Sequence, residues 1–82
     1  MISLTFIVNG TEKVVSNVNV NQKLHVAVQK ALEQSGNTGR DISQWHIIYN
    51  GQTLNGNQKV ETFNFTDDAV IFLSLKAGQG GV

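Results

Sequence analysis

Apolar side chains alternate along the first residues of the chain. Large apolar residues occupy every second position from residue 2 to residue 8, which predicts a strand with one buried face. Asn9-Gly10 follows, and an Asn-Gly pair between two strand-like runs is typical of a type I′ turn, because both residues tolerate a positive φ. The returning strand is predicted over residues 13–18. The pattern therefore indicates an N-terminal β-hairpin.

An amphipathic helix is predicted next, over residues 22–35. Five apolar residues recur at helical spacing and form one stripe: Leu24, Ala27, Val28, Ala31 and Leu32. Asn21 has the side chain of an N-cap, and Gly36 stands where a left-handed residue ends a helix. We expect the stripe to be the face with which the helix covers a sheet.

The second half of the chain returns to strand patterns. Residues 45–49 are rich in aromatic and β-branched side chains, which predicts a third strand. Three of its residues are expected on the buried face: Trp45, Ile47 and Tyr49. Asn50-Gly51 closes this strand with a second turn, before a short partner strand at residues 53–54.

An irregular or 3₁₀ segment and a last strand complete the expected fold. Three apolar residues of the segment are expected to anchor it on the core: Val60, Phe63 and Phe65. Asp67-Asp68 turns the chain into a strand over residues 70–75, for which alternation allows two registers. We favour the register that buries the following residues: Ile71, Leu73 and Leu75. The element order predicts an α+β fold, with a mixed sheet of four to five strands wrapped on one helix.

Composition limits the organisation and the compartment. A chain of 82 residues with 40% apolar side chains has room for one domain, predicted over residues 1–76, with residues 77–82 as a flexible tail. The formal net charge is zero and Lys and Arg do not cluster, so we expect neither nucleic acid nor a membrane as partner. Without cysteines, and without a signal-peptide pattern at residue 1, the chain is expected in the cytoplasm.

Catalytic and metal-binding patterns are weak in this sequence. His25 and His46 have neither a cysteine nor a second histidine at ligand spacing, so no metal site is expected. Asp67-Asp68 is better explained by turn chemistry than by acid–base catalysis, and no nucleophile or phosphate-loop motif is found. We therefore expect no enzymatic activity, no catalytic residue and no cofactor.

The last six residues, Ala77-Gly78-Gln79-Gly80-Gly81-Val82, have a different character. Three glycines in the final five positions cannot contribute to a packed core. Because the segment directly follows an apolar strand, it is expected to leave the domain as a narrow, mobile backbone. Glycine has no Cβ, so such a backbone can lie close to the catalytic groups of another protein. This geometry suits a chain end that enters a partner's active site.

The chain resembles ubiquitin over nearly its whole length. The resemblance lies in the order of the Asn9-Gly10 hairpin, the helix, the run Ile47-Ile48-Tyr49-Asn50-Gly51-Gln52-Thr53-Leu54, the last strand and the Gly-Gly tail. It implies the β-grasp fold. Within that superfamily the chain is most similar to bacterial ubiquitin-like modifiers that are encoded beside an activating enzyme, a conjugating enzyme and a JAMM-type peptidase.

The resemblance implies that this protein is a substrate of enzymes rather than an enzyme. The carboxyl group of Gly81 would be adenylated with ATP, passed to an enzyme cysteine and joined to an amine of an unknown target protein by an isopeptide bond. Gly80 and Gly81 would lie in a narrow channel, and Val82 would first be removed by the peptidase. The resemblance also suggests a role in bacterial antiphage defence.

Two groups of residues are candidates for partner recognition on the same grounds. The stretch ahead of the Gly-Gly pair, which partners of ubiquitin read, corresponds here to Lys76-Ala77-Gly78-Gln79. Ubiquitin also presents an apolar patch around an isoleucine of its third strand, and Ile48 matches that position. Alternation places His46 on the same face as Ile48, and Ser74 of the last strand completes the candidate patch.

Two other functions stay open at this point. A sulfur-carrier protein shares the β-grasp and the Gly-Gly tail but passes on a C-terminal thiocarboxylate. Such carriers usually end at the second glycine, and Val82 argues mildly against this reading. A non-conjugated adaptor or assembly module would use the tail without forming any covalent bond.

Overall fold

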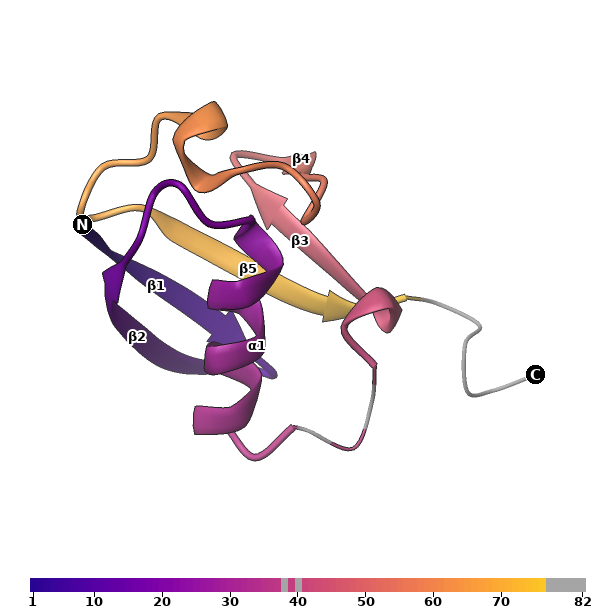
Figure 1. The fold of residues 1–82 in the computed structure, drawn as a ribbon. Helices are drawn as coiled ribbons and strands as arrows, with labels where there is room; N and C mark the ends of the chain where they lie inside the picture. The colour runs from indigo at the N-terminus through magenta and orange to yellow at the C-terminus, as the bar shows by residue number, and fades with distance from the viewer. Residues whose placement is uncertain (38, 40, 77–82) are drawn as a thin grey trace.

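Five strands form one mixed sheet, with a helix across one of its faces (Figure 1). The computed structural model describes residues 1–37, 39 and 41–76. The sheet order is β2-β1-β5-β3-β4. The elements, in chain order, are β1 (Ile2–Val8), β2 (Thr11–Val18), α1 (Leu24–Gln34), η1 (Ile42–Gln44), β3 (Trp45–Tyr49), β4 (Gln52–Thr53), η2 (Val60–Phe63) and β5 (Val70–Leu75).

The pairing of the strands makes β5 the middle of the sheet. β1 runs antiparallel to β2 and parallel to β5, and β5 runs antiparallel to β3. The last strand therefore lies between the N-terminal hairpin and β3. Its hydrogen bonds join these two parts into one sheet. The expected α+β class and β-grasp arrangement are confirmed.

The core lies between the sheet and α1. The five apolar residues of the predicted helical stripe are all buried, and so are Trp45 and Ile47 on β3. Val60 is 1% exposed and Phe65 is 9% exposed. The segment from η2 to Phe65 therefore anchors on the core, as predicted. The ring of Phe65 also meets Tyr49 edge-on, with 4.9 Å between the centroids. The half-buried Tyr49 and Phe63 pack against the same core.

Both Asn-Gly turns have the predicted backbone conformation. The φ angles are 52° and 78° at Asn9 and Gly10, and 51° and 78° at Asn50 and Gly51. Two successive positive φ angles are characteristic of a type I′ turn, whose twist matches that of the strands it joins. These turns therefore set the register of the β1–β2 and β3–β4 pairs.

The start of the helix differs from the prediction. α1 begins at Leu24 rather than at residue 22, and Asn21 is not its N-cap. The residues before the helix form a separate turn, because the side-chain oxygen of Asn19 accepts a hydrogen bond from the N–H of Asn21 at 2.9 Å. The N–H groups of Leu24 and His25 donate instead to the carbonyl groups of Gln58 and Gly56, so a distant loop caps the helix.

The end of the helix follows the prediction. Gly36 has a φ of 76°, and its N–H donates to the carbonyl group of Glu33. The N–H of Asn37 donates to the carbonyl group of Leu32 at 2.8 Å. This pair of hydrogen bonds is a Schellman motif, which needs a left-handed residue at the position of Gly36.

The register of β5 is the favoured one, with one correction. Ile71 is fully buried and Leu73 is 4% exposed, but Leu75 is 37% exposed and is not a core residue. β1 pairs with β5 only as far as Leu73, so Leu75 is flanked by β3 alone. The prediction failed at Leu75 because alternation does not tell where a neighbouring strand ends.

Candidate functional site

The outer face of the sheet, opposite to α1, carries the residues of the predicted partner-binding patch. Pairing between β3 and β5 sets His46 opposite Ser74 and Ile48 opposite Phe72, so these side chains lie on one face. His46 and Ile48 are half-buried, and Ser74 is exposed. The structure thus brings the three predicted residues together, and their role in binding stays a prediction.

The most exposed apolar residues of this face belong to β5. Phe72 is 51% exposed and Val70 41%. Ile7 of β1 pairs with Phe72 from the other side, so Ile7, Ile48, Val70 and Phe72 form a continuous area, which we call the outer apolar surface. Phe72 was not named in the predicted patch, although the favoured register of the last strand already placed it on the same face as Ser74. Its alternation with Ile71 and Leu73 was the available signal.

The end of β5 fixes the place from which the tail starts. The N–H of Lys76 donates to the carbonyl group of Gln44 at 2.9 Å, and Lys76 is half-buried. The other predicted recognition, conjugation and processing residues lie outside the described residues: Ala77, Gly78, Gln79, Gly80, Gly81 and Val82. Their roles, and the domain boundary after residue 76, remain predictions.

A hollow of about 380 Å³ lies beside this end of the sheet. Residues from three segments line it, among them Trp45, His46, Leu54, Asn55 and Lys76. It combines an aromatic and an aliphatic wall with polar groups. A protein that binds the chain beyond Lys76 would therefore find a concave surface with both apolar and polar groups beside Lys76.

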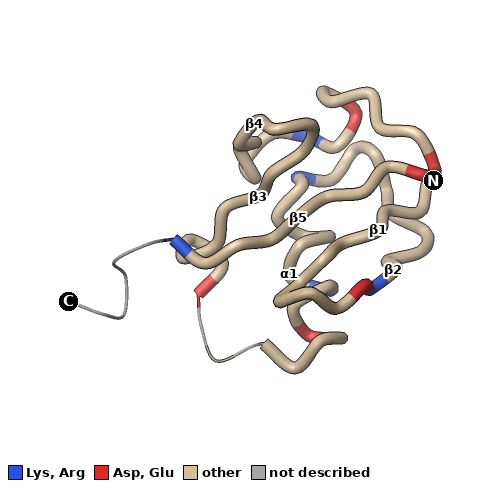
Figure 2. Tube along the Cα trace, turned by 180° about the vertical axis from the view of Figure 1, so that it is seen from behind, with Lys and Arg blue, Asp and Glu red and all other residues tan. Residues whose placement is uncertain are grey.

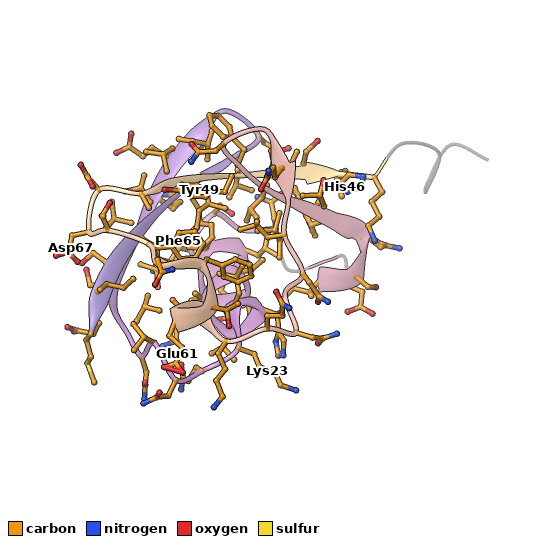
Figure 3. The ribbon with its side chains drawn as sticks, turned by 90° about the horizontal axis from the view of Figure 1, so that it is seen from above. Lys23, His46, Tyr49, Glu61, Phe65 and Asp67 are labelled. Atoms are coloured by element: carbon orange, nitrogen blue, oxygen red, sulfur yellow. The ribbon has the colours of Figure 1, made fainter. Side chains whose placement is uncertain are left out.

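The opposite end of β5 is acidic. The N–H of Ser3 donates to the carboxylate of Asp67 at 3.2 Å, and the hydroxyl of Thr66 donates to the carboxylate of Asp68. The hydrogen bond from Thr66 lowers the pKa of Asp68 below its usual value, and a bond from the backbone N–H of Asp68 itself adds to this. Figure 3 shows Asp67 and His46 at opposite ends of the molecule.

Neither a metal centre nor a membrane segment is found in the part of the chain that the structure describes. None of these residues form a group of three or more side chains able to hold a metal ion. Over the same residues, no helix has the length and apolar character needed to cross a membrane.

The arrangement of strands and helix defines a ubiquitin-like β-grasp fold. A de novo designed protein based on ubiquitin has a TM-score of 0.78 and 22% identity, with 99% of this chain and 95% of that protein covered. The ubiquitin of Caldiarchaeum subterraneum has a TM-score of 0.75 and 13% identity, covering 96% of this chain and 98% of that one. At these identities the likeness establishes the fold.

The chain belongs to the family described as "Protein of Unknown function (DUF2604)", whose model matches residues 1–81. A relative, the uncharacterized protein y4jI of Sinorhizobium fredii (strain NBRC 101917 / NGR234), is 37% identical over 81 residues, or 98% of this chain. The chain spans 62% of the length of that relative.

Proposed function

We propose that this protein is a ubiquitin-like modifier that is attached to other proteins through the carboxyl group of Gly81. The observation that carries the proposal is the combination of a ubiquitin-like fold with a Gly80-Gly81 pair shortly after its last strand. β5 ends beside the hollow at Lys76, so an enzyme that binds there has the start of the tail within reach.

The chemistry proceeds in four steps, all performed by partner enzymes. A peptidase of the JAMM type hydrolyses the bond between Gly81 and Val82, which frees the carboxylate of Gly81. An activating enzyme joins this carboxylate to the α-phosphate of ATP and releases pyrophosphate. A cysteine thiolate then displaces AMP and forms a thioester, which is passed on to a conjugating enzyme. Finally, a target amine attacks the thioester, forms the isopeptide bond and releases the thiol.

Glycine at positions 80 and 81 has a physical reason in this scheme. An extended backbone without side chains fits a channel that excludes any residue with a Cβ, and its carbonyl carbon can approach the attacking group closely. A methyl group at position 81 would therefore slow both the adenylation and the transfer. The domain itself supplies recognition for these enzymes, through the predicted patch of His46, Ile48 and Ser74 and the residues around Lys76.

The setting that we propose is the bacterial cytoplasm, with antiphage defence as the biological role. The family relative from Sinorhizobium fredii is bacterial, which supports the bacterial setting. The proposed partners are an activating enzyme, a conjugating enzyme, a JAMM-type peptidase and the target proteins that become modified.

The test is intact-mass and peptide mass spectrometry of the protein recovered from its native cells. We expect a pool that ends at Gly81, together with adducts that leave the last glycines on a target lysine after digestion. Gly81→Ala should abolish the adducts. The matched control is Gly39→Ala, because Gly39 lies in a loop where an added Cβ meets no atom within 4 Å.

Other outcomes distinguish the alternative functions. A mass gain at Gly81 that corresponds to the replacement of oxygen by sulfur would identify a sulfur carrier. If every molecule retains Val82 and no adduct is found, the modifier proposal is wrong. A non-conjugated adaptor is then favoured.

A further inference from the structure

A second hollow lies at the other end of β5, at the acidic end of the outer face. Its volume is about 440 Å³, within the usual range of ligand pockets. Val70 and Phe72 of β5 contribute its apolar part, and the Asn50-Gly51 turn and Asp68 contribute polar groups. We propose that this hollow binds a partner protein through an aromatic or long aliphatic side chain that is flanked by lysine or arginine.

The apolar requirement follows from β5. Val70 and Phe72 are exposed by 41% and 51%, and both point to the outer face. A contiguous exposed apolar area next to a concavity is typical of an interaction site, whereas isolated exposed apolar residues are ordinary. An apolar side chain placed on these two residues removes their surfaces from water and displaces the water in the hollow.

The basic requirement follows from the charges around the hollow. Asp68 is charged and lines the hollow. Within the described part of the chain, no lysine or arginine lines it. The hydrogen bond from Thr66 keeps the pKa of Asp68 low, so the carboxylate is ionised at neutral pH. Asp67 precedes it in the same loop. A cationic partner residue therefore meets an unneutralised carboxylate beside the apolar floor.

The opposite end of the strand does not offset this charge. Lys76 follows Phe72 by four residues, which is about 13 Å along an extended strand. Figure 2 shows the separation, with red acidic segments where the chain enters β5 and a blue basic segment where it leaves. The acidic hollow and the basic tail end therefore suit partners of different charge.

This inference does not depend on the proposed conjugation chemistry. The described residues that line the hollow belong to the folded domain, between Tyr49 and Phe72. Binding at the hollow is therefore expected to be the same in the Gly81→Ala variant. A failure of the docking proposal and a failure of the modifier proposal give different results.

The experiment uses the full chain, labelled with ¹⁵N, and three synthetic peptides. The first has a tryptophan flanked by two arginines on each side, the second replaces the arginines with glutamates, and the third replaces the tryptophan with alanine. We expect amide shifts from the first peptide, centred on residues 49–51 and 66–72, with weaker binding at high salt. The glutamate and alanine peptides should bind at least about fivefold more weakly.

Two pairs of variants locate the site. Phe72→Ser should abolish measurable binding of the arginine–tryptophan peptide, whereas Val14→Ser should leave it unchanged, although Val14 is an equally exposed residue of the same sheet at 48%. Asp68→Asn should weaken binding about two- to fivefold at low salt, as for other exposed ion pairs. Glu33→Gln, a matched loss of charge on α1, should have no effect.

Four results would overturn the proposal. Equal affinity for the arginine and glutamate peptides would remove the charge argument. Shifts centred outside the hollow, or equal losses in Val14→Ser and Phe72→Ser, would place the binding elsewhere. Shifts at Val70 and Phe72 that depend on protein concentration without any peptide would show that a second copy of this chain occupies the face.

Discussion

Replacing two neighbouring residues of β5 tests the register on which both candidate sites depend. Ile71 is fully buried against the core, and Phe72 is 51% exposed on the outer face. A shift of the strand by one residue would exchange the two faces, because side chains alternate along a strand. Ile71→Ala and Phe72→Ala should therefore differ strongly in their effect on the free energy of unfolding.

The expected magnitudes follow from the burial. Ile71→Ala removes three carbon atoms from the core, which costs about 2.4 kcal/mol at about 0.8 kcal/mol for each buried CH₂ group. The cavity that remains raises the loss to about 3–4 kcal/mol. Phe72→Ala removes a side chain that is only half buried, so the loss should be about 1 kcal/mol. A domain of this size has a stability of about 4–12 kcal/mol, so Phe72→Ala should stay folded, and Ile71→Ala should stay folded where the starting stability exceeds about 5 kcal/mol.

Urea unfolding followed by tryptophan fluorescence measures both values. The chain has one tryptophan, and Trp45 is 4% exposed, so its emission reports the loss of the core. Equal losses in the two variants, or a larger loss for Phe72→Ala, would show that the assigned faces of β5 are wrong. The outer apolar surface and the acidic hollow would then lose their basis.

Two further variants, one of them paired with a control variant, test local features of the fold. Thr66→Val removes the hydroxyl that bonds to Asp68, so the pKa of Asp68 should rise toward its usual value in an NMR titration, and an unchanged pKa would contradict the assignment. Because the pKa of Asp68 is lowered in the folded state, the stability that it contributes is present above its unfolded pKa and is lost as the pH falls through the folded pKa. Gly51→Ala, at a φ of 78°, should cost about 1–2 kcal/mol in thermal or urea unfolding. Gly39→Ala, without a positive φ, should change stability by less than about 0.5 kcal/mol, and similar effects of the two changes would argue against the type I′ turn.

The sequence was sufficient for the elements whose signals are local. The two Asn-Gly turns, the helical stripe and Gly36 at the helix end each depend on residues within a few positions, and each was found as predicted. The order of these elements then restricted the fold to a sheet covered by a helix. The resemblance to ubiquitin added the expectation of the β-grasp.

The errors arose where a distant segment decides the local structure. The helix starts at Leu24 because backbone carbonyl groups of Gln58 and Gly56 cap it. No residue near position 21 indicates that these distant carbonyl groups are its capping partners. Leu75 is exposed because β1 stops pairing at Leu73. The acidic hollow combines the turn after β3 with the loop before β5, and it could not be found before the two were known to be adjacent.

The geometry of β5 bears on how several partners could use this small domain together. One hollow lies near Val70 and the other beside Lys76, which are about 20 Å apart along an extended strand. Under the two proposals, an enzyme that holds the tail occupies the basic end and leaves the acidic hollow accessible to a cationic partner. If both proposals hold, the attached modifier would keep a free docking surface on its target, because the bond to the target is made through the opposite end. Recognition after conjugation and activation before it would then depend on different residues, and mutations could separate them.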